Sequence, residues 1–135
     1  MNRRHVFQLA AAALGARLGA NAQTKAAPQR SPLIQQDLPK MDGKDWTVSL
    51  VEVVYPPGGG SESHRHPGPV CVYVLEGALV NKLDDGETIT YKPGGTFYEQ
   101  AMHLHTIARN ASQTEPVKFL AFLITEKGKP LTVPK

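Results

Sequence analysis

Hydrophobic and polar residues alternate along the chain in short segments, and no segment repeats with a helical period over three turns. The first clear segment follows Asp45 and is rich in β-branched residues until Pro56 to Gly60 end it. Asp84-Asp85-Gly86 separates two later segments as a hairpin turn, because Asp-Gly supplies the positive φ angles of tight β-turns. Strands are predicted over residues 45–55, 70–75, 78–83, 88–92, 96–99, from near 105, and 117–125. Short strands that each end at Gly, Pro or Asp predict an all-β sandwich or barrel.

The first 22 residues are predicted to be an export signal. Arg3 and Arg4 precede an apolar, alanine-rich segment at 6–16, and Ala20-Asn21-Ala22 has the small residues that a signal peptidase requires. The paired arginines resemble a twin-arginine signal, with the Sec route as the alternative. An N-terminal helix of the folded domain is disfavoured, because residues 10–16 show no polar face. We therefore expect a bacterial periplasmic protein with no membrane anchor after processing.

The rest of the chain has the length of one domain. Residues 23–44 are polar and punctuated by proline, which predicts a flexible lead-in with one short strand at 33–38. The barrel is expected over residues 45–127, and residues 128–135 are expected to be a C-terminal tail. The unpaired strand edges of a small barrel favour a homodimer, in which the lead-in strand would pair with a partner subunit.

The charge balance narrows the range of partners. The whole chain carries 15 basic and 12 acidic residues, and removal of residues 1–22 leaves 12 of each. No cluster of Lys and Arg with interleaved aromatic residues remains, so nucleic acid is a poor partner and a small molecule is the expected one. The single cysteine, Cys71, excludes an internal disulfide.

Two pairs of histidines carry the candidate chemistry, His64 with His66 and His103 with His105. On a strand, residues two apart lie on the same face, so neutral imidazoles with this spacing can reach one divalent metal ion. One such pair is more often part of a surface loop. A second pair in an apolar strand context favours the metal, because buried imidazoles without partners would be costly.

The residues around the first pair resemble the first motif of the cupin superfamily, in the form found in small single-domain cupins with type-2 motifs. They read Gly58-x5-His64-Arg65-His66, followed by Tyr73-Val74-Leu75-Glu76-Gly77. The resemblance covers residues 48–125, which is most of the chain after the leader. It implies a double-stranded β-helix (jelly-roll) barrel.

The second cupin motif is matched in part. His105 falls on the motif histidine, whereas Gln100 and Met102 stand where Pro and Gly are usual, and Asn110 lies one residue later than the pattern requires. The resemblance implies that His64, His66 and His105 hold a divalent metal near one mouth of the barrel. Fe²⁺ or Mn²⁺ is the favoured ion, with Zn²⁺, Ni²⁺ and Cu²⁺ as alternatives.

One departure from the family pattern is informative. The family usually adds a Glu to the three histidines, and its position falls on Cys71, or on Val70 in a shorter variant of the motif. We favour a three-histidine centre with open coordination positions. In the first alternative, Cys71 takes part, as in some thiol-oxidising cupins that place a Cys beside the iron. In the second, Cys71 is a small buried strand residue and metal binding is weak.

Glu99 is the candidate catalytic residue. If its side chain points into the barrel, it could replace the missing carboxylate or act as a general base; if it points outward, it is an ordinary surface charge. His103 is expected at the rim, because the motif assigns the metal to His105. Cys71, Tyr73 and Tyr98 are candidate substrate-binding residues at the mouth, although packing is the usual role of strand tyrosines.

These features predict an exported, metal-binding cupin that acts as a metal-dependent enzyme on a small molecule, with dioxygenase-like chemistry favoured. The fold also hosts isomerases, decarboxylases and lyases, so it does not by itself select a reaction. The alternative is a non-catalytic periplasmic protein that binds a small molecule or a metal ion. An inward Glu99 would favour catalysis, and an outward one would favour binding.

Overall fold

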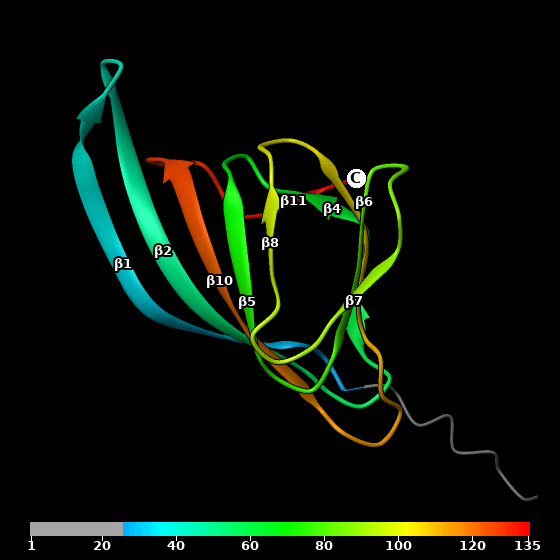
Figure 1. Cartoon of the computed structure of the whole chain (residues 1–135). Helices are drawn as coiled ribbons and strands as arrows, with labels where there is room; N and C mark the ends of the chain where they lie inside the picture. Colours follow the sequence, from blue (N-terminus) through cyan, green and yellow to red (C-terminus); the bar gives the residue numbers. More distant parts are fainter. Residues whose placement is uncertain (1–25) are drawn as a thin grey trace, which may run out of the picture.

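The computed structural model describes residues 26–135, so the predicted export signal lies outside the described residues. The chain forms two antiparallel sheets that face each other around a common interior (Figure 1). The strands of the five-stranded sheet are, in spatial order, β1 (Gln29–Met41), β2 (Lys44–Tyr55), β10 (Val117–Glu126), β5 (Val70–Glu76) and β8 (Thr96–Glu99). The predicted all-β class is confirmed.

The second sheet holds the shorter strands and closes the other side of the barrel (Figure 1). Its strands are β11 (Val133–Pro134), β4 (His64–Arg65), β9 (Leu104–Asn110), β6 (Leu79–Leu83) and β7 (Ile89–Tyr91), and β3 (Gly60–Ser61) also pairs with β9. The predicted Asp-Gly hairpin joins β6 to β7, where Leu79 lies opposite Tyr91 and Asp84 takes a φ of 46°. No helix capable of spanning a membrane occurs within residues 26–135.

The core lies between the sheets and is built from alternate residues of three central strands. Val51 and Val53 of β2, for example, are 7% and 5% exposed, and their neighbours in sequence face the other side of the sheet. The same alternation runs along β5 and β10. A strand that places every second side chain inward produces this pattern directly. The buried residues of the three strands are Val51, Val53, Tyr55, Val70, Val72, Val74, Val117, Phe119, Ala121 and Leu123.

The short strand predicted at 33–38 lies within a longer strand, β1, so the described part of the lead-in is more ordered than expected. Strand β1 pairs with β2 from Gln29 opposite Val54 to Met41 opposite Lys44. Asp42 and Gly43, with φ angles of 50° and 73°, form the tight turn between the two strands. One edge of β1 thus pairs within its own chain, and because β1 is the edge strand of the sheet, pairing with a partner subunit stays a prediction.

The prolines that suggested flexibility belong to an edge strand. The register of β1 against β2 shifts between Pro32 and Ile34 and again between Leu38 and Met41, on either side of Pro39. Proline lacks the N–H that a central strand needs, but an edge strand with bulges tolerates it. Composition alone did not distinguish a proline-bearing edge strand from a loop.

The predicted C-terminal tail also belongs to the fold in part. Val133 lies opposite Arg65, and Pro134 lies opposite His64, so β11 covers the strand that carries the first histidine pair. The barrel therefore extends beyond the expected limits of 45–127 at both ends. Short segments of two paired residues carry too little hydrophobic periodicity to be recognised in a sequence.

Candidate metal centre

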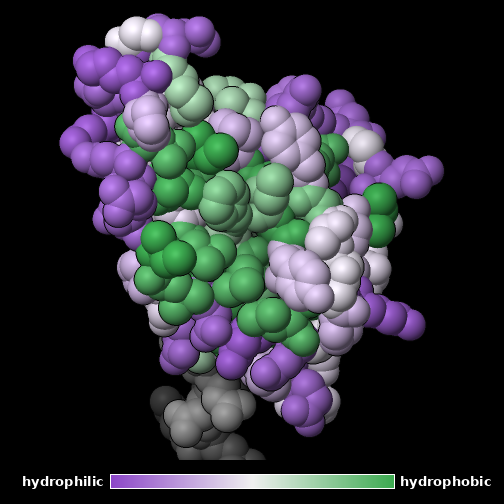
Figure 2. All heavy atoms as spheres, turned by 60° about the vertical axis from the view of Figure 1, so that its left-hand side comes forward, coloured by the Kyte–Doolittle hydropathy of each residue, from purple (hydrophilic) through white to green (hydrophobic). Residues whose placement is uncertain are grey.

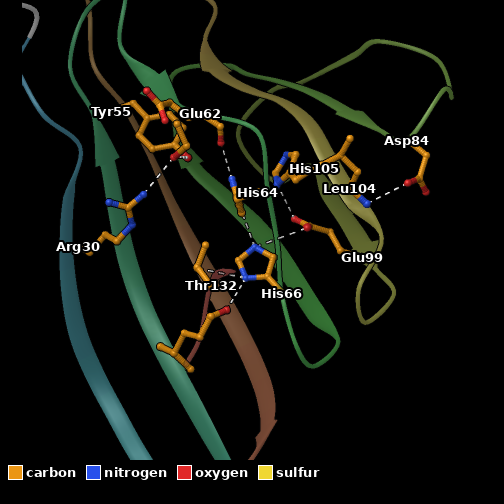
Figure 3. Close-up of polar contacts among 12 residues, drawn as sticks. Arg30, Tyr55, Glu62, His64, His66, Asp84, Glu99, Leu104, His105 and Thr132 are labelled. Atoms are coloured by element: carbon orange, nitrogen blue, oxygen red, sulfur yellow. Dashed lines mark hydrogen bonds and ion pairs between the residues drawn. The ribbon is translucent and has the colours of Figure 1, made fainter. Parts of the chain in front are cut away.

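The first histidine pair points into the barrel from the end of β4, with His64 on the strand and His66 directly after it, and backbone carbonyls orient both rings (Figure 3). His64 Nδ1 lies 2.7 Å from the carbonyl oxygen of Glu62, and His66 Nδ1 lies 2.7 Å from that of Leu131. A carbonyl only accepts, so each Nδ1 donates its proton and each Nε2 keeps an unprotonated lone pair. The two Nε2 atoms are 3.1 Å apart. The fold thus presents two imidazole lone pairs to one point.

His105 completes a cluster of three. It lies on β9 directly opposite His64, and its ligand nitrogen and those of the other two rings all lie within 4.8 Å of one another. His105 is 5% exposed, and neither of its ring nitrogens has a hydrogen-bond partner. Buried polar atoms without partners are costly, so this ring is placed as a ligand would be.

The donor set fits a divalent metal ion. Two nitrogens that are each about 2.1 Å from one ion stand 3.1 Å apart, as His64 and His66 do, when the angle between them is about 95°. Burial lowers the pKa of His64, and the hydrogen bond to Glu62 opposes this only in part. The neutral imidazole, which is the form that binds metals, is therefore favoured at neutral pH.

Glu99, on β8, brings a carboxylate beside this cluster, next to His66 and His105. Its side chain points inward and is 2% exposed. One carboxylate oxygen is 3.2 Å from His105 Nδ1, without the alignment of a hydrogen bond, and the other is 3.7 Å from His66 Nε2 (Figure 3). Of the two orientations left open by the sequence, the structure thus adopts the inward one.

The cluster opens on a small cavity inside the barrel. Its volume is about 90 Å³, well below the ~300–1,000 Å³ of pockets that hold drug-sized ligands. Most of its wall is aliphatic or aromatic, and its polar groups are the histidines, Glu99 and a group at the other end that includes Tyr55 and Arg30. The apolar wall residues are Val51, Val53, Val70, Val72, Phe97, Phe119, Ala121, Leu123 and Leu131. Such a cavity suits a ligand of a few heavy atoms with an apolar middle.

The matching protein family is described as "Cupin domain", and the match covers residues 51–123, more than half of the chain. The chain belongs to the cupin family. This confirms the resemblance seen in the motifs, and the jelly-roll barrel agrees with it. A comparison with curated proteins found no match.

Solved structures with the same fold include proteins of different activities. The DMSP lyase DddQ from Ruegeria pomeroyi DSS-3 is 19% identical with a TM-score of 0.62, and the match covers 95% of this chain and 60% of that one. A cupin domain from Bordetella pertussis Tohama I is 21% identical with a TM-score of 0.56, covering 76% of this chain and 97% of that one. The polyketide cyclase RemF from Streptomyces resistomycificus is 24% identical with a TM-score of 0.54, covering 64% and 59%. This cupin thus spans only part of the length of the lyase and the cyclase, and these likenesses show the fold alone.

The structure explains the missing Glu of the first cupin motif. Val70, not Cys71, is the inward residue at that position: Val70 is 1% exposed and lines the cavity, whereas Cys71 is exposed. Glu99 lies directly opposite Val70 on the neighbouring strand. In this cupin the carboxylate therefore reaches the histidines from the next strand of the same sheet.

The predicted place of Cys71, Tyr73 and Tyr98 at the mouth of the barrel is wrong. Tyr73 and Tyr98 are 47% and 55% exposed, and all three side chains lie on the outer face of the five-stranded sheet, where Figure 2 shows hydrophobic side chains gathered. The alternation along β5 places Val70 and Val72 inward, so the odd-numbered residues must face outward. Cys71 is neither a ligand nor a buried packing residue.

His103 lies away from the cavity, as expected. Its Nδ1 contacts the carboxylate of Asp84 on the surface, and the backbone N–H of Leu104 donates to the same carboxylate at 2.9 Å. Met102 takes a φ of 64°, the left-handed conformation that explains why the family usually has Gly at this position. The chain thus turns just before β9 and separates His103 from His105.

Sequence reasoning missed Tyr55, Ser61 and Arg30 at the other end of the cavity. The Tyr55 hydroxyl lies 2.6 Å from Ser61 Oγ, and Arg30 donates to the same oxygen at 3.0 Å. Burial raises the pKa of Tyr55, so its hydroxyl stays protonated. The alternation of β2 could have placed Tyr55 inward together with Val51 and Val53, but Arg30 could be found only once β1 was recognised as a strand.

Proposed function

We propose that this cupin is an exported, periplasmic, metal-dependent enzyme that acts on a small molecule by dioxygenase-like chemistry. The observation that carries the proposal is the buried carboxylate of Glu99 beside three imidazoles whose lone pairs converge. Burying a carboxylate among neutral rings costs free energy unless a cation compensates it.

Each residue of the site has a distinct part in the proposal. His64, His66 and His105 bind the ion, and the carbonyls of Glu62 and Leu131 hold the first two rings in the required tautomer. Glu99 is the fourth ligand, in place of the glutamate that the family carries one strand away. The apolar wall excludes water and holds the carbon skeleton of the substrate.

The metal is proposed to be Fe²⁺ or Mn²⁺. A mixed set of imidazole and carboxylate donors suits these ions. When bound, such an ion would supply electrophilic polarisation of a substrate oxygen and the one-electron chemistry that reactions of dioxygen require. His64, His66, His105 and Glu99 would hold it, and further positions on the ion would be available to a substrate.

Other observations support an enzyme more broadly. Structures with this fold include a lyase and a cyclase, both of which act on small molecules according to their names. Export rests on the sequence of residues 1–22 alone. The dioxygenase-like reaction rests on the donor set, since fold similarity does not select a reaction.

The experiment is metal analysis of protein expressed from the full-length sequence and recovered from the periplasmic fraction. We expect about one equivalent of iron or manganese per chain. Glu99→Gln should lower metal affinity by more than about tenfold, and Glu126→Gln, which neutralises a carboxylate far from the cavity, should leave it unchanged. Nitric oxide should bind the Fe²⁺-loaded protein and give a new electron paramagnetic resonance signal, because it occupies open positions on ferrous ions.

The outcomes separate the alternatives. Absence of stoichiometric metal in the wild-type protein would end the catalytic proposal. Full metal content in Glu99→Gln would exclude the ligand role of Glu99. A metal centre that fails to bind nitric oxide would have no open position, and the non-catalytic binding protein would then be the better description.

A further inference from the structure

Arg30 stands at the end of the cavity opposite Glu99. Figure 3 shows the two side chains on opposite sides of His64 and His66. Arg30 reaches in from β1 and is held by a hydrogen bond from Nη2 to Ser61 Oγ, whose oxygen also contacts the buried Tyr55 hydroxyl. These contacts fix one edge of the guanidinium at the cavity wall.

The rest of the guanidinium has no partner among residues 26–135. Arg30 is exposed, and no carboxylate in this part of the chain lies within 4.0 Å of it, whereas five lysines and His103 form ion pairs elsewhere on the surface. Arginine carries five N–H donors in a planar fork, and the contact with Ser61 uses one of them. The geometry of this fork matches the two oxygens of a carboxylate.

A surface groove leads to the cavity past this residue. The groove and the cavity share four lining residues, Arg30, Ser61, His64 and Thr132. The remaining groove residues include the polar Glu62 and Ser63, whereas the interior beyond the histidines is apolar. A ligand in this groove contacts Arg30 and His64 together at the entrance to the cavity.

We propose that the substrate of this cupin is a small carboxylic acid with a second oxygen donor. Arg30, supported by Ser61, binds its carboxylate at the groove end, and the second oxygen reaches the histidine cluster. The apolar wall between them accommodates a short carbon chain, since the cavity is only about 90 Å³. This inference names the substrate class of the proposed enzyme and rests on that function.

The test uses malonate, succinate and glutarate, which span increasing distances, together with the diamide of each, which has no carboxylate. Binding to Zn²⁺-loaded protein, in which no turnover by redox chemistry occurs, is measured by calorimetry. We expect one chain length to bind best and its diamide to bind at least about tenfold more weakly, because a hydrogen bond to a charged group contributes about that factor in affinity. Arg30→Gln should weaken the diacid by about 10–100-fold and leave metal content unchanged.

Arg109→Gln is the matched control. Arg109 is an exposed arginine on β9 whose side chain does not line the cavity, so this variant makes the same change in net charge. Equal affinities for diacid and diamide, or equal losses in Arg30→Gln and Arg109→Gln, would overturn the inference while leaving the metal centre intact. Loss of metal binding by the wild-type protein would instead overturn the proposed function.

Discussion

His64 and His66 enter the barrel together, whereas His103 and His105 have the same spacing and point in different directions. In the first pair His64 lies on β4 and His66 follows directly after that strand ends at Arg65, and their ring nitrogens still reach one point. In the second pair His105 lies on β9, which begins at Leu104, whereas His103 follows the left-handed Met102 and precedes the strand. Equal spacing therefore brings two rings together beside β4 and separates them at the turn before β9. Identical motifs therefore acquire different chemistry from the backbone that carries them.

The largest effect, a loss of metal affinity, is expected from removing the imidazole of His105, with removal of the His103 imidazole as the comparison. His105→Ala should reduce metal affinity by more than about 100-fold, beyond the ~10–100-fold that loss of a partner of a ligand costs. His103→Ala, the matched change two residues away, should leave metal content at the wild-type level. Titration with Co²⁺ followed by visible absorption measures both affinities. Comparable losses of metal affinity in the two variants would contradict the assignment of His105, and not His103, as a metal ligand.

The next largest effect, on the free energy of unfolding, is expected from Asn110, the last residue of β9. The buried Asn110 donates to the carbonyls of Tyr55, Pro56 and Glu115 and accepts from Ser112 N. Asn110→Ala leaves these buried groups without partners, which should lower the free energy of unfolding by ~2–4 kcal/mol. Urea denaturation measures the change. Asn81→Ala is a useful comparison, because Asn81 Oδ1 is buried without a hydrogen-bond partner and its loss should cost less.

A smaller effect should come from the turn that separates the second pair. Met102→Gly removes the strain of a φ of 64° in a residue with a side chain, and should raise the free energy of unfolding by about 1 kcal/mol. Met102→Ala keeps the Cβ atom and should bring no comparable gain. Thermal unfolding compares the three proteins. An unchanged stability in Met102→Gly would show that the turn is not strained.

The smallest effect, also on stability, should come from the carboxylate of Asp84, which contacts the His103 ring on the surface. The N–H of Leu104 and the His103 ring lower the pKa of Asp84 below its usual 3.8. The unfolded chain then binds the proton more readily, so this contribution to stability is present above pH 3.8 and is lost as the pH falls through the lowered pKa. Asp84→Asn should be slightly less stable than the wild type at pH 7, and the difference should vanish near pH 2. A difference that persists at low pH would assign the effect to something other than this charge.

Strand β5 shows why part of the site could not be predicted. Val70, Val72 and Val74 alternate with Cys71, Tyr73 and Leu75, and both sets are largely apolar. Alternation then identifies a strand but gives no preference for which set faces inward. Pairing with β8 and β10 decides which set of β5 side chains faces inward. Cys71 and Tyr73 belong to the outward set, so they do not reach the cavity. The sequence left the direction of the Glu99 side chain, inward or outward, open for the same reason.

What the amino-acid sequence determined by itself was local. β-branched segments ended by Gly, Pro and Asp specified the all-β class, and the motif spacing singled out His64, His66 and His105 as ligands. Tertiary structure alone decided that Glu99 lies opposite Val70, that Arg30 reaches the cavity, and that Tyr98 faces outward. The reason is that periodicity depends on neighbours along the chain. The face that a side chain occupies depends on pairing with strands tens of residues away.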